Sequence, residues 1–459
     1  MIGGMEQVTL KINDIPVEVP AGTTILEAAR TAGIQIPTLC YLKEINQEGA
    51  CRMCVVEVKG ARTLMSACTT AVSTGMEVKT HSEAVLSFRR HTLELLCANH
   101  HLDCEYCPRY SDCELHALLR SHGIPAKKIG QFYMEPQFDK TAHHLIRDAN
   151  RCLLCRRCVA VCRKQGVEAI ALLGRGETTR IGAPLGVGNS NCVHCGQCTT
   201  VCPTGALVER DGTRAVRVAL AHKDRHPIAI VAPEVWAAVG ESFQEKIGVN
   251  CRGKLAAFLR RVGFEKVYDL SRFPAEAGTG KISSACPSVT AYIRQKFPEL
   301  LPLVSEAPIP AEQAAAEYRK QAARDLGVSQ DSVVVVSVSP CTAEKAEQGG
   351  NIDVPITTRE LVNLLRDASV SRSTALNVWR HLGDEFYDNE DAPRIPAKTV
   401  SVSGLDQVDR ALRSLWEGSE EPVVLWACPG GCLNGGGQPR QWGDIHNFED
   451  LVSLRSPGL

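Results

Sequence analysis

Two cysteine runs between residues 151 and 204 constrain the fold more than any other feature of the sequence. Each run has the spacing C-x2-C-x2-C-x3-C, and the second ends in Cys-Pro. Three thiolates spaced this closely can cover one face of a cubane iron–sulfur cluster, which takes its fourth ligand from elsewhere. Structural zinc is the alternative, but zinc takes four ligands per site, commonly as two pairs. Two sets of three cysteines, each with a distant fourth, favour clusters over zinc.

The spacing resembles that of bacterial ferredoxins with two [4Fe–4S] clusters, in which the fourth cysteine of each run ligates the other cluster. This resemblance implies two ligand sets with exchanged fourth members, and the exchange ties both halves into one small domain. We call them the first cubane set (Cys152, Cys155, Cys158 and Cys202) and the second cubane set (Cys192, Cys195, Cys198 and Cys162).

The N-terminal residues predict a hairpin, a helix and four further cysteines. Strands are expected at 8–13 and 16–19, and a helix through 25–33 with Thr23 or Thr24 as its cap. A hairpin followed by a helix is the opening of a β-grasp fold. The cysteine spacing resembles the [2Fe–2S] ferredoxin domain at the N-terminus of multi-cluster hydrogenases and of the large iron–sulfur subunit of complex I. The implied [2Fe–2S] set is Cys40, Cys51, Cys54 and Cys68.

A histidine and three cysteines follow a predicted helix at 82–99, in which Val85, Leu86 and Leu93 contribute to an apolar face. Three thiolates leave one corner of a cubane open. We expect His100 to fill it, and His101 is the neighbour that could take its place. A neutral imidazole changes the charge of a cluster and hence its reduction potential. The expected His100 set is His100, Cys104, Cys107 and Cys113, whereas Cys97 is expected in the core.

Length and composition narrow the class of protein. The 459 residues are enough for three or four domains, and a net charge of −1 gives no basic surface for nucleic acid. The sequence has no run of 18 apolar residues and no secretory-signal layout at its start. It contains no Walker motif, no G-x-G-x-x-G after a strand and no flavin motif. Most of the 21 cysteines fall in metal-ligand spacings that need a reducing compartment, so we expect a cytoplasmic protein without a membrane span.

After residue 215 the pattern predicts an α/β domain with a parallel sheet, because continuous apolar strands alternate with helices. Ligands in such sheets lie beyond the carboxyl ends of strands, which is where Cys341 and Cys428 fall. The expected elements are a strand and then a turn within 226–236, a helix and then a strand within 253–270, a strand within 328–341, a helix at 357–368 and a strand within 420–432.

Three segments in this region carry a second resemblance. They are SSACPSV at 283–289, SPCTAEKAE at 339–347 and WACPGGCLNGGGQP at 426–439. Together with the N-terminal modules, they resemble an [FeFe]-hydrogenase catalytic chain. A complex I large subunit shares the N-terminal modules but lacks the third segment. In the hydrogenases, four cysteines hold a [4Fe–4S] cubane, and one bridges to the diiron centre that handles H2. The implied C-terminal set is Cys286, Cys341, Cys428 and Cys432, with Cys432 as the bridge.

Several positions depart from the hydrogenase pattern. Ala285 stands where the family has a proton-relaying cysteine, and Glu344 stands where a lysine hydrogen-bonds a cyanide ligand. Lys345 is one residue away, a shift that should point it elsewhere. Trp426 replaces a methionine of the diiron pocket, and the family's T-G-G-V-M-E-A motif is missing. We therefore expect a shortened hydrogenase-like domain that keeps the cubane and lacks the diiron centre.

The expected organisation is a [2Fe–2S] domain at 1–80, a one-His/three-Cys module at 81–121, a two-cubane domain at 122–214 and the hydrogenase-like domain at 215–459. These would carry one [2Fe–2S] and four [4Fe–4S] clusters. The resemblance implies an electron-transfer subunit of an NAD(H)-linked, electron-bifurcating complex. Its implied partners are a flavoprotein binding NADH and FMN, a small [2Fe–2S] subunit, ferredoxin, and a catalytic subunit such as a [NiFe]-hydrogenase or formate dehydrogenase. The alternative is a divergent catalytic or sensory [FeFe]-hydrogenase that retains the diiron centre.

Overall fold

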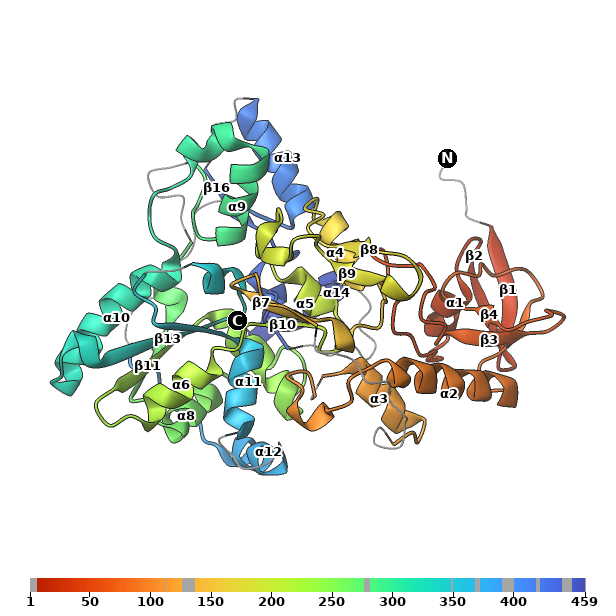
Figure 1. Cartoon of the computed structure of the whole chain (residues 1–459), viewed down its shortest axis with the longest axis horizontal. Coiled ribbons are helices and arrows are strands. Elements are labelled where there is room, and N and C mark those ends of the chain that lie inside the picture. Colours follow the sequence, from red (N-terminus) through yellow and green to blue (C-terminus); the bar gives the residue numbers. More distant parts are fainter. Residues whose placement is uncertain are drawn as a thin grey trace.

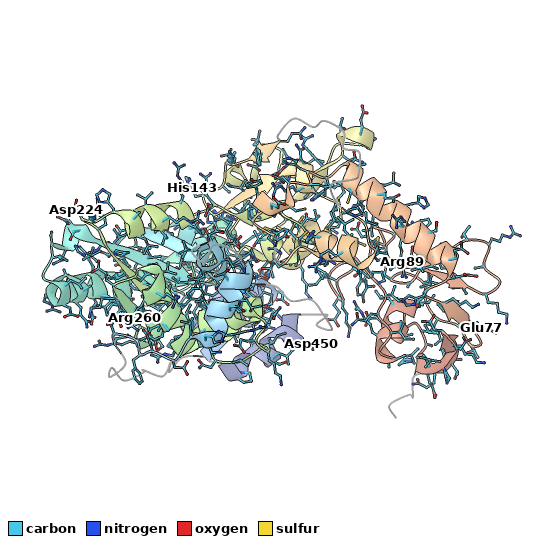
Figure 2. The ribbon with its side chains drawn as sticks, turned by 90° about the horizontal axis from the view of Figure 1, so that it is seen from below. Glu77, Arg89, His143, Asp224, Arg260 and Asp450 are labelled. Atoms are coloured by element: carbon cyan, nitrogen blue, oxygen red, sulfur yellow. The ribbon has the colours of Figure 1, made fainter. Side chains whose placement is uncertain are left out.

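The chain forms an elongated molecule with a small N-terminal sheet at one end and a parallel sheet at the other (Figure 1). Glu77 in the first sheet and Asp224 beside the second lie near opposite ends of the long axis (Figure 2). The computed structural model describes residues 6–110, 112–125, 137–275, 281–347, 350–367, 372–389, 400–417, 422–439 and 448–458. Part of the expected connector between the His100 set and the cysteine runs, residues 126–136, lies outside this description.

The N-terminal domain has the predicted hairpin and helix. Asn13 and Asp14 both have positive φ, as a two-residue hairpin turn of type I′ requires. Thr24 is the helix cap, since its hydroxyl accepts a hydrogen bond from the backbone N–H of Glu27 at 3.3 Å. The sheet order is β2-β1-β5-β3-β4, with β1 and β5 parallel. The elements are β1 (Gln7–Ile12), β2 (Ile15–Pro20), α1 (Ile25–Thr31), β3 (Val55–Val58), β4 (Met65–Ser66) and β5 (Glu77–Lys79).

Two helices connect this domain to the centre of the molecule, α2 (Glu83–Ala98) and α3 (Glu114–Ser121). The buried face of α2 carries Val85, Arg89, Leu93 and Cys97 at a spacing of four residues. Cys97 is therefore a core residue, as predicted. The expectation for Leu86 was wrong, because its side chain is 44% exposed. Arg89 replaces it in the contact with the sheet, and its guanidinium donates to the Val55 carbonyl at 2.9 Å where α2 meets the N-terminal domain (Figure 2).

The central domain contains both cysteine runs, each of which leads into a helix. Strands β7 and β10 are antiparallel, and β6 pairs with the other edge of β7. The sequence did not predict β6, β7 or β9, because strands of two to four residues are too short for a clear alternation. The elements are β6 (Phe138–Asp139), β7 (Leu145–Asp148), α4 (Arg157–Lys164), β8 (Ala171–Leu173), β9 (Arg180–Gly182), α5 (Gln197–Val201) and β10 (Leu207–Glu209).

The C-terminal region contains a four-stranded parallel sheet in the order β12-β11-β13-β14, as an α/β domain requires. One core packs α7, α8 and α11 on the sheet, and a second core packs α10 on it. The turn expected after β11 is instead a helix that begins at Pro233, a residue well suited to a first helical position. The elements are α6 (Thr213–Ala221), β11 (His226–Val231), α7 (Pro233–Val239), α8 (Arg252–Val262), β12 (Lys266–Asp269), α10 (Pro310–Leu326), β13 (Val333–Ser339), β14 (Val354–Thr357), α11 (Thr358–Asp367) and α12 (Arg372–His381).

A second, smaller layer lies above this sheet in Figure 1. The expected strand at 420–432 does not join the four-stranded sheet, because it forms a separate parallel pair. Helices α9 and α13 pack against this strand pair, in a core that also includes Val167 and Val193 of the central domain. The elements are α9 (Pro287–Lys296), β15 (Val400–Ser403), α13 (Leu405–Trp416), β16 (Val423–Trp426) and the final helix α14 (Phe448–Arg455). Within the described residues, no helix combines the length and the apolar character needed to cross a bilayer.

Candidate metal centres

The [2Fe–2S] set lies in the loop between α1 and β3 and in the strand–loop region that follows. All four cysteines are buried. The Sγ atoms of Cys54 and Cys68 are 3.2 Å apart, and Cys51 Sγ accepts a hydrogen bond from the Leu39 N–H at 3.4 Å. The neighbouring Cys40 thiol holds the pKa of Cys51 below its usual range, at about 6. The Cys68 thiol likewise lowers the pKa of Cys54, so the chain gathers the four predicted thiols and favours thiolates at Cys51 and Cys54.

The His100 set follows the end of α2. His100 is only 5% exposed, and burial lowers its pKa to about 4, which keeps the imidazole neutral and able to act as a ligand. The side chain of His101 is 53% exposed and lies 3.8 Å from Asp103. Burial raises the pKa of Cys104, and the nearby Cys107 thiol raises it further. These placements support His100 over His101, and the ligand assignment stays a prediction.

The thiols of the two cysteine runs lie close to one another. Burial raises the pKa of Cys158 well above its usual value, and the thiols of Cys155, Cys152 and Cys202 raise it further. Burial likewise raises the pKa of Cys198, followed by effects of Cys192, Cys195 and Cys162. Thiols affect one another in this way only at short range, because the interaction falls with distance. These placements agree with the crossing that the ferredoxin resemblance implies, and the assignment of each cysteine to a cluster stays a prediction.

The two runs repeat one backbone geometry. Leu154 and His194 have φ of +54° and +62°, and Arg156 and Gly196 have φ of +63° and +67°. The left-handed region costs an L-residue about 1–2 kcal/mol, so the repeat of both positions reflects a loop that must turn tightly around its thiols. A side chain is accommodated at Arg156, whereas Gly196 lies directly against Thr342 of the hydrogenase-like domain.

The C-terminal set draws on both layers of the last domain. Cys341 follows β13 of the parallel sheet, Cys286 begins α9, and Cys428 and Cys432 lie in the loop after β16. Burial raises the pKa of Cys341, and nearby Cys286 and Cys428 contribute to the rise. Burial also raises the pKa of Cys432, to which Cys428, Cys341 and Cys286 contribute. The four predicted thiols meet where the two layers face each other.

Two half-buried carboxyl groups lie beside this set. Ser337 donates a hydrogen bond to Glu344 at 3.1 Å, and burial raises the pKa of Glu344 to about 7. Glu234, at the start of α7, lies close enough to Cys432 and Glu344 to raise the pKa of both. The sequence analysis missed Glu234. The available signal was its position just after Ala-Pro at the carboxyl end of β11, the edge where ligands of a parallel sheet bind.

The side chains of Lys345 and Trp426 reach other partners. Lys345 donates to the Pro355 carbonyl at 2.8 Å and pairs with Glu360 at 3.0 Å, away from the thiols. The indole N–H of Trp426 donates to the Ser401 hydroxyl on β15 at 3.0 Å. Lys345 therefore does not take the place of the family's lysine, whose position is occupied here by Glu344.

Within the described part of the chain, no group of three or more His, Cys, Asp or Glu side chains is arranged to hold a single metal ion. A cluster differs from a single ion, since its ligands surround an inorganic core of iron and sulfide. The individual ligands therefore remain predictions that rest on spacing and placement.

Comparisons with known proteins agree with this architecture. Residues 225–378 match the family described as the iron-only hydrogenase large subunit, C-terminal domain. The NADP-reducing hydrogenase subunit HndD of Solidesulfovibrio fructosivorans is 34% identical over 96% of this chain and 90% of its own length. The chain belongs to the iron-only hydrogenase large-subunit family. Another member, iron hydrogenase 1 of Clostridium pasteurianum, is 28% identical over 94% of this chain and 88% of its own.

The N-terminal half of this family member also resembles subunits of NADH-linked oxidoreductases. Residues 5–83 match a 2Fe–2S cluster-binding domain, 89–127 an NADH-ubiquinone oxidoreductase-G iron–sulfur binding region, and 151–206 a 4Fe–4S dicluster domain. The NADH-ubiquinone oxidoreductase 75 kDa subunit of Reclinomonas americana is 33% identical, but over only 44% of this chain and 29% of its own length. The family, the multidomain fold class and the iron–sulfur binding domains are thus confirmed. The domain boundaries and the number of clusters stay predictions.

Proposed function

We propose that the chain is the iron–sulfur electron-transfer subunit of a multisubunit, NAD(P)H-linked oxidoreductase complex. The observation that carries this proposal is the continuity of the five predicted ligand sets, since each touches a neighbour through named contacts. Electron transfer slows steeply with distance, so an uninterrupted series of neighbouring clusters is the arrangement a relay needs. The relatives support the same role, because they are named as subunits of NADP-reducing and NADH-linked enzymes.

One side chain links the [2Fe–2S] set to the first cubane set. The buried amide of Asn46 donates to the Cys40 carbonyl at 2.7 Å and to the Cys155 carbonyl at 3.0 Å. Arg157 lies beside the same junction and is paired with Glu114 at 2.7 Å. A guanidinium in this position stabilises negative charge on either cluster. These contacts support transfer from the [2Fe–2S] cluster to the first cubane.

The His100 set adjoins the same first cubane set. A Cβ atom on Gly205 would lie 2.7 Å from Cys107 Sγ, so glycine is needed for this close approach. The Glu114 N–H also donates to the Pro203 carbonyl at 2.9 Å, directly after Cys202. The two N-terminal clusters would therefore converge on one cubane, which gives the relay two inputs.

The second cubane set adjoins the C-terminal set. Thr342, the residue after Cys341, donates to the His194 carbonyl at 2.8 Å. Gln197 donates to the Asn434 carbonyl at 3.0 Å, and Thr199 donates to the Gly436 carbonyl at 2.8 Å. The loop that holds Cys428 and Cys432 is thus bound to the second cysteine run, which supports the C-terminal cubane as the end of the relay.

The proposed complex joins this chain to a flavoprotein that uses NADH or NADPH and FMN, a small [2Fe–2S] subunit, ferredoxin, and a further catalytic subunit of the [NiFe]-hydrogenase or formate dehydrogenase type. Electron bifurcation between NAD(P)H and ferredoxin is part of the proposal, since the two converging inputs suit two electron donors or acceptors. The ligand assignment gives one [2Fe–2S] and four [4Fe–4S] clusters, which is about 18 iron atoms per chain.

We also propose that the diiron centre is absent. A diiron unit with cyanide ligands is anionic, and the half-buried carboxyl groups of Glu234, near Cys432, and Glu344, near Cys341, disfavour it when they are ionised. Ala285 offers no proton at the position of the relaying cysteine. The alternative of a divergent hydrogenase is favoured by the retained bridging residue, Cys432.

Infrared spectroscopy separates the two possibilities. The chain is produced together with the assembly enzymes for the diiron centre, with a complete [FeFe]-hydrogenase as the positive control. We expect no bands of bound CO or cyanide in this chain. The electron-transfer role is tested by purifying the native complex and adding NADH or NADPH. We expect EPR signals of reduced clusters in the complex and none in the isolated chain. Reduction of the isolated chain by the nucleotide would contradict the need for a flavoprotein partner.

A further inference from the structure

A buried histidine lies against one ligand of the second cubane set. His144 directly precedes β7, and its side chain is 0% exposed. Its Nε2 atom lies 3.7 Å from Cys192 Sγ, within the range of a hydrogen bond to sulfur. The ring packs on that of His194, with centroids 4.7 Å apart and an angle of 52° between their planes. A residue 48 positions away in sequence is thus held against the thiol by the fold.

The partners of the ring indicate where its hydrogen lies. Nδ1 of His144 has no hydrogen-bonding partner among the described residues. A neutral imidazole has one N–H donor and one acceptor nitrogen, and the tautomer is assigned from the surrounding partners. The N–H is stabilised at Nε2, because it then faces Cys192 Sγ, which carries a negative charge when the cysteine is a cluster ligand. Nδ1 is then the unprotonated nitrogen.

The first cubane set also has a side chain near one of its cysteine sulfurs. Thr204 Oγ1 lies 3.8 Å from Cys202 Sγ, but this hydroxyl donates its hydrogen to the Arg151 carbonyl at 2.6 Å. The hydroxyl hydrogen is therefore not directed at the sulfur. Thr204 therefore supplies no hydrogen to its sulfur, whereas Nε2 of His144 faces a ligand of the second cubane set, the set that adjoins the C-terminal set.

We propose that His144 is a positioning residue that donates a hydrogen bond to the Cys192 thiolate and so raises the reduction potential of the second cubane. The inference rests on the proposed relay function. The cubane gains one electron from the first cubane and passes it to the C-terminal cubane, with no bond broken and no proton transferred. Hydrogen bonds to cluster sulfurs stabilise the more negative, reduced state, and this raises the potential.

Five variants test this role. His144→Phe keeps an aromatic ring beside His194 and removes the donor. His144→Met and His144→Gln form a second pair, because they have similar volumes and only Gln carries an N–H group. His143→Gln is the control, since this adjacent histidine is exposed at the surface (Figure 2). Cys192→Ser identifies which EPR signal belongs to the second cubane.

The readout is an EPR-monitored redox titration of the anaerobically purified full chain. We expect the Phe and Met variants to lower the equilibrium constant for reduction of the second cubane roughly tenfold. This corresponds to a reduction potential that is about 59 mV lower for one electron. The Gln variant should lie closer to the unaltered chain, and His143→Gln should leave the potential unchanged. Equal potentials in the Met and Gln variants would overturn the inference. If Cys192→Ser alters no EPR signal and no iron content, the cluster itself is absent and the proposed function fails instead.

Discussion

Replacement of Gly196 by alanine tests the junction between the second cubane set and the C-terminal domain. Gly196 has φ of +67°, and an added Cβ would lie 2.8 Å from Thr342 Cγ2 and 3.0 Å from Gly436 Cα. Contacts this short force the facing segments apart. At this junction, two separate domains of the proposed relay meet at one glycine.

The magnitude follows from conformation and contacts. An alanine in the left-handed region costs about 1–2 kcal/mol. Displacing the facing segments also weakens the bonds from Thr342 to the His194 carbonyl and from Thr199 to the Gly436 carbonyl, each worth about 1 kcal/mol. The total is roughly 3–4 kcal/mol. Gly327→Ala is a matched control, because Gly327 has φ of +68° and an added Cβ there would meet no atom within 4 Å.

The assay compares thermal unfolding of the two cluster-loaded variants and the reduction of their clusters by a chemical reductant, followed by freeze-quench EPR. We expect Gly327→Ala to show only the conformational cost and normal reduction. Gly196→Ala should be clearly less stable and should reduce its C-terminal cubane more slowly than its second cubane. Equal losses of stability in both variants, with unchanged reduction rates, would refute the reasoning about this junction.

Three further predictions concern single residues. His100→Cys should retain the cluster but lower its potential, because a thiolate adds negative charge; an unchanged redox titration would remove His100 from the ligand set. Arg455→Met should cost about 3–5 kcal/mol by removing the cation that is paired with the buried Glu241 carboxylate, and should remove the bond to the Leu433 carbonyl beside the cysteine loop; calorimetry checks this, with a neutral result counting against it. Glu344→Gln should flatten the pH dependence of stability, since burial raises the folded-state pKa from 4.5 to about 7. The unaltered chain then loses stability as pH rises from about 4.5 through 7, whereas the variant should not.

Cluster chemistry explains why much of the candidate site could be predicted from sequence. The spacing of the two cysteine runs predicts clusters, and the ferredoxin resemblance implies the exchange of Cys162 and Cys202. The N-terminal hairpin could also be predicted, since Asn13 and Asp14 provide the turn between two strands in which apolar and polar residues alternate. In both cases the signal lies within one short segment of the chain.

The features that sequence reasoning missed depend on tertiary contacts. An apolar run at 423–426 indicates a strand but not which sheet it joins, so the separate pairing of β16 with β15 was not predictable. Leu86 has the right spacing for the buried face of α2, yet Arg89 makes the contact to β3. Glu234 and His144 acquire their significance only where the fold brings them against Cys432 and Cys192.

Mössbauer spectroscopy of anaerobically purified, ⁵⁷Fe-enriched protein tests the five-cluster relay most directly. The ligand assignment predicts about 18 iron atoms per chain, with roughly 11% of the iron as [2Fe–2S] and the remainder as [4Fe–4S]. The account also predicts no low-spin iron with the parameters of a CO- and cyanide-ligated site. Cubane iron for only two or three clusters after full reconstitution would contradict the relay. A low-spin diiron component would contradict the proposed loss of the diiron centre.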